Sequence, residues 1–274
     1  MRKFSKSAFG SVALALLLGA HGAAARVRSE PGVYSVTVQP IKVGMRHLHI
    51  TYVRPVVPRH PKFLIVFTTG DGGWHGVSNQ VIKHLAERGY SIAGMSAPDV
   101  LRPLKRAGRK MSAVQAADLL GAAFARFRKD LAVAASTRLI VVGYSRGATF
   151  AAFTAIHSEL HADLAGAIAI ALTRQADYFR SMAPRARGSR RIRQNKRRRG
   201  LIYPALKRFA YVRVAVIQST GDRYVRAAES RKLLGPDTAT RRLYTVEARN
   251  HRFGRGRAQL IKDLDAALHW IERP

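Results

Sequence analysis

The chain has 274 residues, and 47% of them are hydrophobic, which suits one globular domain with a buried core. Its formal net charge is +32, which favours polyanionic partners such as anionic lipid, acidic glycans or nucleic acid. Cysteine is absent, which excludes disulfides, thiolate metal sites and a cysteine nucleophile.

The first 25 residues predict a secretory signal peptide, 1–25. Three basic residues precede a short apolar run over 8–20, and an A-x-A cleavage site follows at 23–25. The run is too short to span a bilayer comfortably, and the alternative is an uncleaved N-terminal anchor. We therefore expect an exported, periplasmic protein whose mature part, 26–274, is a single domain.

The predicted elements beyond the signal form an α/β pattern. Two alternating segments, 33–38 and 47–53, predict early strands. Further strands are expected at 63–67, 91–95, 139–142, 165–172, 212–217 and 243–246, and helices at 77–85, 114–131, 148–157 and 260–271. Strands that are apolar on both faces and alternate with helices indicate a mainly parallel sheet flanked by helices. The fold class is therefore α/β, with the α/β-hydrolase fold as the expected architecture.

The loop after the fifth expected strand carries a nucleophile motif. Gly143-x-Ser145-x-Gly147 lies between a strand and a helix, where small residues allow the two to approach at a strained turn. The N-terminus of the following helix favours a developing negative charge. We expect Ser145 to be a nucleophile, and the alternative is an ordinary turn serine between two glycines.

Two later strand ends supply an acid and a base in the chain order that α/β-hydrolases use. Asp222 follows the seventh expected strand, and His251 alone among ten histidines lies in the loop after the last one. His251 would accept the Ser145 proton, and Asp222 would orient the imidazole. The alternative role of Asp222 is a helix N-cap, in which case Asp99 is the next candidate acid.

A glycine-rich segment, Thr68 to Trp74, follows the third expected strand. We expect an oxyanion hole made by the backbone N–H of Arg146 and that of Asp71 or Gly72. The glycine spacing fits neither a dinucleotide-binding loop nor a Walker loop, and no spacing of His, Asp or Glu indicates a metal site. We expect no cofactor and no metal.

The segments TTGDGGW, GYSRGA, ALTRQADY and NHRF together resemble the VirJ/AcvB-type bacterial virulence proteins over about residues 62–271. The resemblance implies a periplasmic serine hydrolase with Ser145, Asp222 and His251 as its triad. It also implies cleavage of aminoacylated phosphatidylglycerol, mainly the lysyl ester, and a link to virulence-associated secretion. The chain departs from the family pattern at Arg146, where Phe is usual, and at Asn250, where Gly or His is usual.

Three residues near the motifs are candidates for substrate binding. A lysyl substrate needs an acid, and Asp71 could receive its ammonium group; the alternative is that Asp71 caps the following helix. Trp74 is either a wall of the substrate pocket or a core residue. Tyr144, directly before the nucleophile, is a candidate substrate contact.

A basic insert over 175–208 separates the sixth and seventh expected strands. Residues 185–199 hold nine Lys or Arg and no acid, which is typical of a solvated segment. α/β-hydrolases commonly place a lid here, and a basic lid could dock on anionic phospholipid with about 1 kcal/mol per charge. Ile192, Leu201, Ile202 and Tyr203 could then touch the acyl region. The candidate anion-binding residues are Arg190, Arg191, Arg193, Lys196, Arg197, Arg198 and Arg199.

Two other functions stay open on the sequence alone. One is a different esterase, thioesterase or peptidase that uses the same triad. The other is a non-catalytic exported module that binds polyanions or secretion-system proteins. Arginines without interleaved aromatic residues argue against nucleic acid as the partner.

Overall fold

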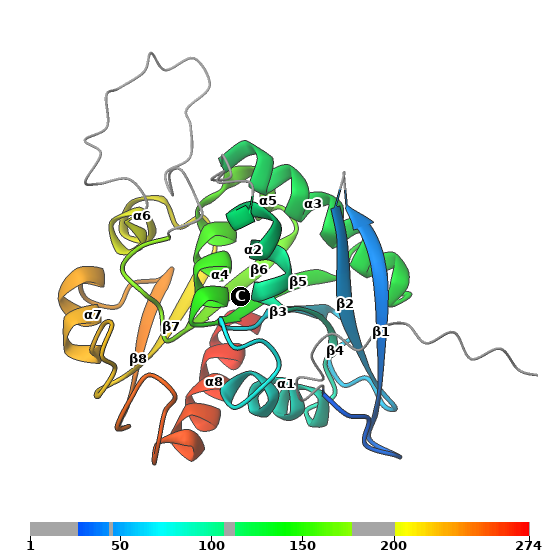
Figure 1. The fold of residues 1–274 in the computed structure, drawn as a ribbon. Helices are drawn as coiled ribbons and strands as arrows, with labels where there is room; N and C mark the ends of the chain where they lie inside the picture. Colours follow the sequence, from blue (N-terminus) through cyan, green and yellow to red (C-terminus); the bar gives the residue numbers. More distant parts are fainter. Residues whose placement is uncertain (1–26, 44–45, 107–112, 177–200, 274) are drawn as a thin grey trace, which may run out of the picture.

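The computed structural model describes residues 27–43, 46–106, 113–176 and 201–273, which form one layered α/β structure (Figure 1). The strands are β1 (Tyr34–Val43), β2 (Arg46–Pro55), β3 (Phe63–Thr68), β4 (Ser91–Met95), β5 (Arg138–Tyr144), β6 (Leu164–Ile170), β7 (Arg213–Ser219) and β8 (Arg241–Val246). The helices are α1 (Val77–Glu87), α2 (Ala97–Arg106), α3 (Ala113–Asp130), α4 (Arg146–Ile156), α5 (Ser158–His161), α6 (Ile202–Phe209), α7 (Ala227–Leu234) and α8 (Arg257–Glu272).

The eight strands form a single sheet in the order β1-β2-β4-β3-β5-β6-β7-β8. β1 pairs antiparallel with β2, and β2 pairs antiparallel with β4. From β4 to β8 all neighbours are parallel, so their carboxyl ends meet at one edge. That edge is where reactive groups collect in an open parallel sheet.

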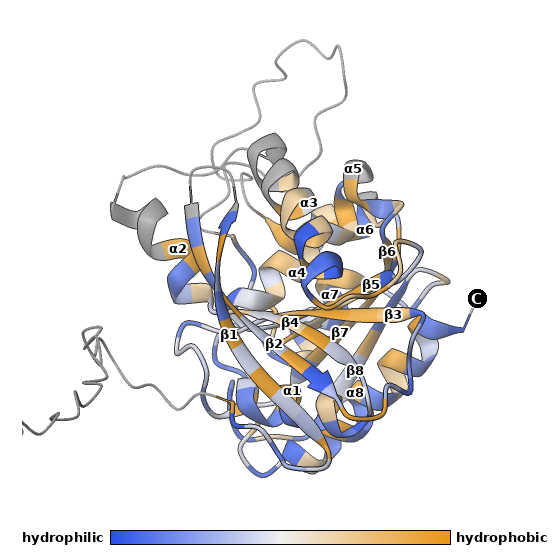
Figure 2. Cartoon of the chain, turned by 90° about the vertical axis from the view of Figure 1, so that its right-hand side faces the viewer, coloured by the Kyte–Doolittle hydropathy of each residue, from blue (hydrophilic) through white to orange (hydrophobic). Residues whose placement is uncertain are grey.

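Both faces of the sheet are covered, which explains why the central strands are apolar throughout. Along β3, Leu64 and Val66 enter one core with α2, α3, α4 and α6, whereas Ile65 and Phe67 enter the other with α1 and α8. The period of two follows from the alternation of side chains along a strand. Figure 2 shows the resulting apolar strands between the two layers of helices.

The sequence analysis predicted all eight strands and the four longest helices of the structure, α1, α3, α4 and α8. It missed α2, α5, α6 and α7. Three of these helices have eight residues or fewer, and a periodic stripe needs a longer window to be recognised. The fourth, α2, contains Pro103, which weakens a helical pattern.

The predicted insert over 175–208 needs a correction at its end. Ile202 and Tyr203 are buried, at 0% and 1% exposure, and belong to the core helix α6, so they cannot contact acyl chains. Gln175 and Leu201 form an antiparallel bridge, which brings the two ends of the segment together. Residues 177–200, and with them every predicted anion-binding residue from Arg190 to Arg199, lie outside the described residues.

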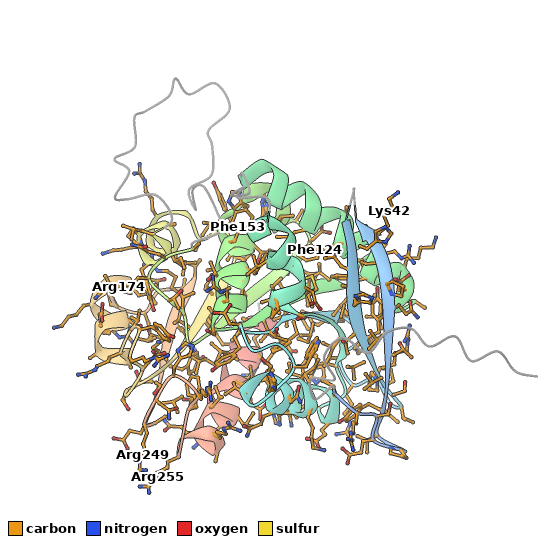
Figure 3. All side chains as sticks on the ribbon, in the orientation of Figure 1. Lys42, Phe124, Phe153, Arg174, Arg249 and Arg255 are labelled. Carbon is orange, nitrogen blue, oxygen red and sulfur yellow. The ribbon has the colours of Figure 1, made fainter. Side chains whose placement is uncertain are left out.

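Side chains follow the same division between core and surface. Phe124 of α3 and Phe153 of α4 are fully buried, whereas Lys42, Arg174, Arg249 and Arg255 extend outward (Figure 3). None of the helices in the described ranges combines the length and the apolarity that crossing a membrane requires.

Candidate active site

Ser145 occupies a strained turn between β5 and α4. Its backbone has φ 54° and ψ −112°, a conformation that residues other than glycine rarely adopt. A Cβ at Gly143 would overlap the carbonyl of Gly147, and a Cβ at Gly147 would overlap the carbonyl of Thr68. The two glycines are therefore required because strand, helix and the neighbouring loop approach each other closely here.

The structure brings Ser145, His251 and Asp222 together from the ends of β5, β8 and β7. His251 Nε2 lies 2.7 Å from Ser145 Oγ, and His251 Nδ1 lies 2.7 Å from Asp222 Oδ2. Asp222 is 1% exposed. The arrangement can pass a proton from the serine to the imidazole while the carboxylate holds the ring.

The alternative role proposed for Asp222, a helix N-cap, is wrong. The N-cap of α7 is Arg226, and Asp222 Oδ1 accepts a hydrogen bond from Tyr224 N over 2.8 Å in the loop before it. Asp99, the next candidate acid, lies in the first turn of α2 and makes no contact with His251 among the described interactions.

Gln218 is a site residue that the sequence reasoning missed. Its side chain is fully buried, and its Nε2 donates to Asp222 Oδ2 over 3.0 Å and to Val225 O over 2.6 Å. Its Oε1 accepts from Leu172 N over 2.9 Å. Gln218 therefore fixes the carboxylate that in turn fixes His251. The available signal was the polar pair Gln218 and Ser219 at the end of the otherwise apolar run of strand β7.

The loop that carries His251 is pinned by its neighbours. Asn250 Oδ1 accepts the N–H of Arg252 over 2.9 Å and that of Gly254 over 3.1 Å, and Phe253 is fully buried. Tyr144 OH donates to the carbonyl of His251 over 3.2 Å. Burial raises the pKa of Tyr144 to about 12, so the phenol keeps its proton at neutral pH. Tyr144 thus packs against the His251 loop, and its contact with substrate stays a prediction.

The glycine-rich loop after β3 lies directly against the nucleophile. A Cβ at Gly70 would stand 3.2 Å from Ser145 Cβ. Gly73 N donates to Gly70 O over 3.0 Å, which closes a turn with Asp71 and Gly72 at its centre. Thr69 Oγ1 holds the loop by accepting from Ala97 N over 3.0 Å.

The N–H groups predicted to bind an oxyanion thus lie on two segments that meet at Ser145. Arg146 is in the first turn of α4, where backbone N–H groups lack intrahelical partners.

Two other predictions about this loop need revision. The N-cap of α1 is Gly76 without a side-chain cap, so Asp71 does not cap that helix. The Asp71 carboxylate instead pairs with the Arg146 guanidinium, which neutralises the positive charge that Arg146 would add. Of the two expectations for Trp74, the structure favours the core, because its ring packs on Gly94 and lies 6.0 Å from the ring of Phe67.

Over the part of the chain that the structure describes, no group of three or more His, Asp or Glu could hold a metal ion.

Comparisons with known proteins agree with this fold. A family model described as bacterial virulence protein (VirJ) matches residues 62–232, more than half of the chain. No curated protein matches the chain.

Three solved structures illustrate the architecture. A proposed dienelactone hydrolase from Klebsiella pneumoniae subsp. pneumoniae is 15% identical, with a TM-score of 0.60 and coverage of 88% of this chain and 99% of that one. Est1E from Butyrivibrio proteoclasticus is 12% identical, with a TM-score of 0.57 and coverage of 86% and 99%. An acylaminoacyl peptidase from Pyrococcus horikoshii is 15% identical, with a TM-score of 0.58, and covers 88% of this chain but only 42% of the peptidase. At these identities the likeness establishes the α/β-hydrolase fold.

Proposed function

The chain belongs to the VirJ family of bacterial virulence proteins, and we propose that it is a serine hydrolase of carboxylic esters. The observation that carries the proposal is the hydrogen-bonded series Ser145–His251–Asp222, with 2.7 Å at both steps. The strained backbone of Ser145 adds support, because such strain persists where function requires it.

The first half of the reaction forms an acyl-enzyme. Ser145 Oγ attacks the ester carbonyl carbon as its proton moves to His251 Nε2, and Asp222 stabilises the imidazolium. The carbonyl oxygen takes up negative charge, which the N–H of Arg146 and one N–H of the Asp71–Gly72 turn would bind. The carbon–oxygen bond to the alcohol then breaks, and His251 returns the proton to the departing alkoxide.

The second half releases the acyl group. His251 takes a proton from a water molecule, and the resulting hydroxide attacks the acyl carbon. The bond from that carbon to Ser145 Oγ breaks, and the serine recovers its proton from His251. The products are one carboxylic acid and one alcohol, and the enzyme is regenerated.

For the substrate we propose an aminoacyl ester of phosphatidylglycerol, with the lysyl ester as the first to test. The family resemblance of the TTGDGGW and GYSRGA segments supports this assignment, and so does the net charge of +32, which favours electrostatic attraction to anionic lipid surfaces. We place the reaction in the periplasm because of the signal-like segment 1–25. Secretion-system proteins are a further proposed partner.

A fluorophosphonate probe tests the proposed activity without knowledge of the substrate. We expect covalent labelling of the full chain and complete loss of labelling in Ser145→Ala. Wild-type enzyme should also release lysine from vesicles that contain lysyl-phosphatidylglycerol. Labelling that survives in Ser145→Ala, or no labelling of the wild type, would refute the serine-hydrolase proposal. Labelling without lysine release would refute only the substrate.

A further inference from the structure

Each member of the candidate triad is followed directly by an arginine. Arg146 follows Ser145, Arg223 follows Asp222, and Arg252 follows His251. The three arginines follow three different strands, Arg146 in the first turn of α4 and the other two in loops, and the hydrogen bonds of the triad bring these segments together. Three positive charges are therefore carried by segments that meet at the triad.

Arg223 is held close to the imidazole by an aromatic ring. Its guanidinium carbon lies 4.9 Å from the ring centre of Tyr224, and its Nη2 donates to Tyr224 OH over 2.9 Å. The Tyr224 ring stands edge-on to His251 with the ring centres 4.8 Å apart. The series Arg223–Tyr224–His251 thus fixes a cation one ring away from the catalytic base.

Arg252 approaches the same site from the other loop. Its backbone N–H is bound by Asn250 Oδ1, so the chain direction next to His251 is fixed. After burial, its positive charge is the largest influence on the pKa of Tyr144, the phenol that binds the His251 carbonyl. Arg252 therefore directly follows the catalytic base on an exposed loop, and its charge influences the phenol that binds that loop.

The three arginines differ in their charge balance. Arg146 is neutralised by Asp71. Arg223 and Arg252 are exposed, and within the described residues neither forms an ion pair with a carboxylate. Asp222 is buried and occupied by His251 and Gln218. The outer surface of the site therefore carries positive charge that is available to a ligand.

We propose that Arg223 and Arg252 bind a phosphate group of the substrate, on the alcohol side of the ester that Ser145 attacks. Guanidinium groups match phosphate oxygens in geometry and charge. A lysyl ammonium group would be repelled by the same two charges, so recognition would run through the phosphodiester. This inference rests on the proposed function and adds the two residues that would bind the phosphodiester of its substrate.

Competition with the fluorophosphonate probe tests this site directly. The labelling rate of the full chain is measured at low ionic strength with glycerophosphoglycerol, inorganic phosphate or neutral glycerol as competitor. The double variant Arg223→Gln/Arg252→Gln is compared with Arg249→Gln/Arg255→Gln. This control removes the same charge from the same region, and neither of its arginines directly follows a triad residue; both extend outward from the fold (Figure 3).

We expect glycerophosphoglycerol to slow labelling about fivefold or more, and glycerol to have no effect. The double variant should lose this protection, the control should keep it, and added salt should weaken it over a screening length of ~10 Å. Protection by inorganic phosphate as well supports a phosphate site, and stronger protection by glycerophosphoglycerol identifies the headgroup as the ligand. Equal protection by glycerol, no protection of the wild type, or protection that survives in the double variant would overturn the inference. An unlabelled wild type would instead refute the hydrolase itself.

Discussion

Asp222 and Gln218 lie beneath the imidazole of His251 and are almost inaccessible to solvent, whereas Arg223 and Arg252 are exposed on the loops that carry Asp222 and His251. The inner pair is joined by hydrogen bonds of fixed geometry, and each buried polar atom left unpaired there would cost about 1–3 kcal/mol. The outer charges act through water and are weakened by salt.

The buried and the exposed residues therefore have different roles in the site. Chemistry needs a proton acceptor held in one orientation, which a buried, fully paired network supplies. Selection among substrates needs only electrostatic attraction to an anionic group, which exposed arginines supply. We call Asp222 and Gln218 the inner layer and Arg223 and Arg252 the outer layer. Substitutions in the inner layer should cause large losses of activity that salt does not change. Substitutions in the outer layer should cause smaller changes in substrate binding that salt abolishes.

The largest effect should come from Asp222→Asn. An amide cannot hold His251 in the tautomer that accepts a proton from Ser145, and a loss of about 10⁴-fold in rate is the magnitude seen for such a change. The rate of ester hydrolysis measures it, with circular dichroism as the check that the fold persists. Asp99→Asn, which changes the alternative acid, is the matched control. A loss of less than tenfold in Asp222→Asn would contradict the assignment of the acid.

Gln218→Leu should have an intermediate effect. It removes the donor to Asp222 Oδ2 and leaves Leu172 N and Val225 O without their side-chain partner. We expect a loss of about 1–3 kcal/mol in unfolding free energy and a 10–100-fold fall in kcat with little change in KM.

Gln218→Glu keeps the volume of the side chain but places a second carboxyl group against Asp222, so we expect kcat to fall in this variant as well. If Gln218→Leu unfolds more readily but its folded form reacts at the wild-type rate, Gln218 only supports the fold. A fall in kcat that is the same at low and high salt places Gln218 in the inner layer.

The parts of this molecule that the sequence predicted are those set by local patterns. Apolar runs such as 139–142 indicate buried parallel strands whatever their partners are. The order Ser145, Asp222, His251 along the chain, each after a strand, is enough to expect the three side chains at one edge of the sheet. The structure places all three within hydrogen-bonding distance.

The parts that the sequence did not predict depend on contacts between distant segments. Gln218 matters because Leu172, Asp222 and Val225 surround it, and nothing in RVAVIQS shows that. Tyr203 adjoins a basic run but donates to Leu172 O over 3.2 Å inside the core. Asp71 pairs with Arg146, 75 positions away, rather than with the helix beside it.

The smallest effect should come from Asp71→Asn. The Asp71 carboxylate is 60% exposed, so its pair with Arg146 is worth only about 0.2–1 kcal/mol. Release of Arg146 would add a third positive charge to the outer layer, and glycerophosphoglycerol should then protect Ser145 about two- to threefold better than in the wild type. Asp263→Asn on α8 removes the same charge elsewhere and should leave protection unchanged.

High salt should erase the difference between Asp71→Asn and the wild type, because both layers keep their structure and only the charge changes. The opposite outcome would be informative about the substrate. If Asp71→Asn abolishes a preference for lysyl over neutral esters and leaves phosphate protection unaltered, Asp71 reads the ammonium group. Asp71, and not Arg223 and Arg252, would then determine which substrate the enzyme prefers.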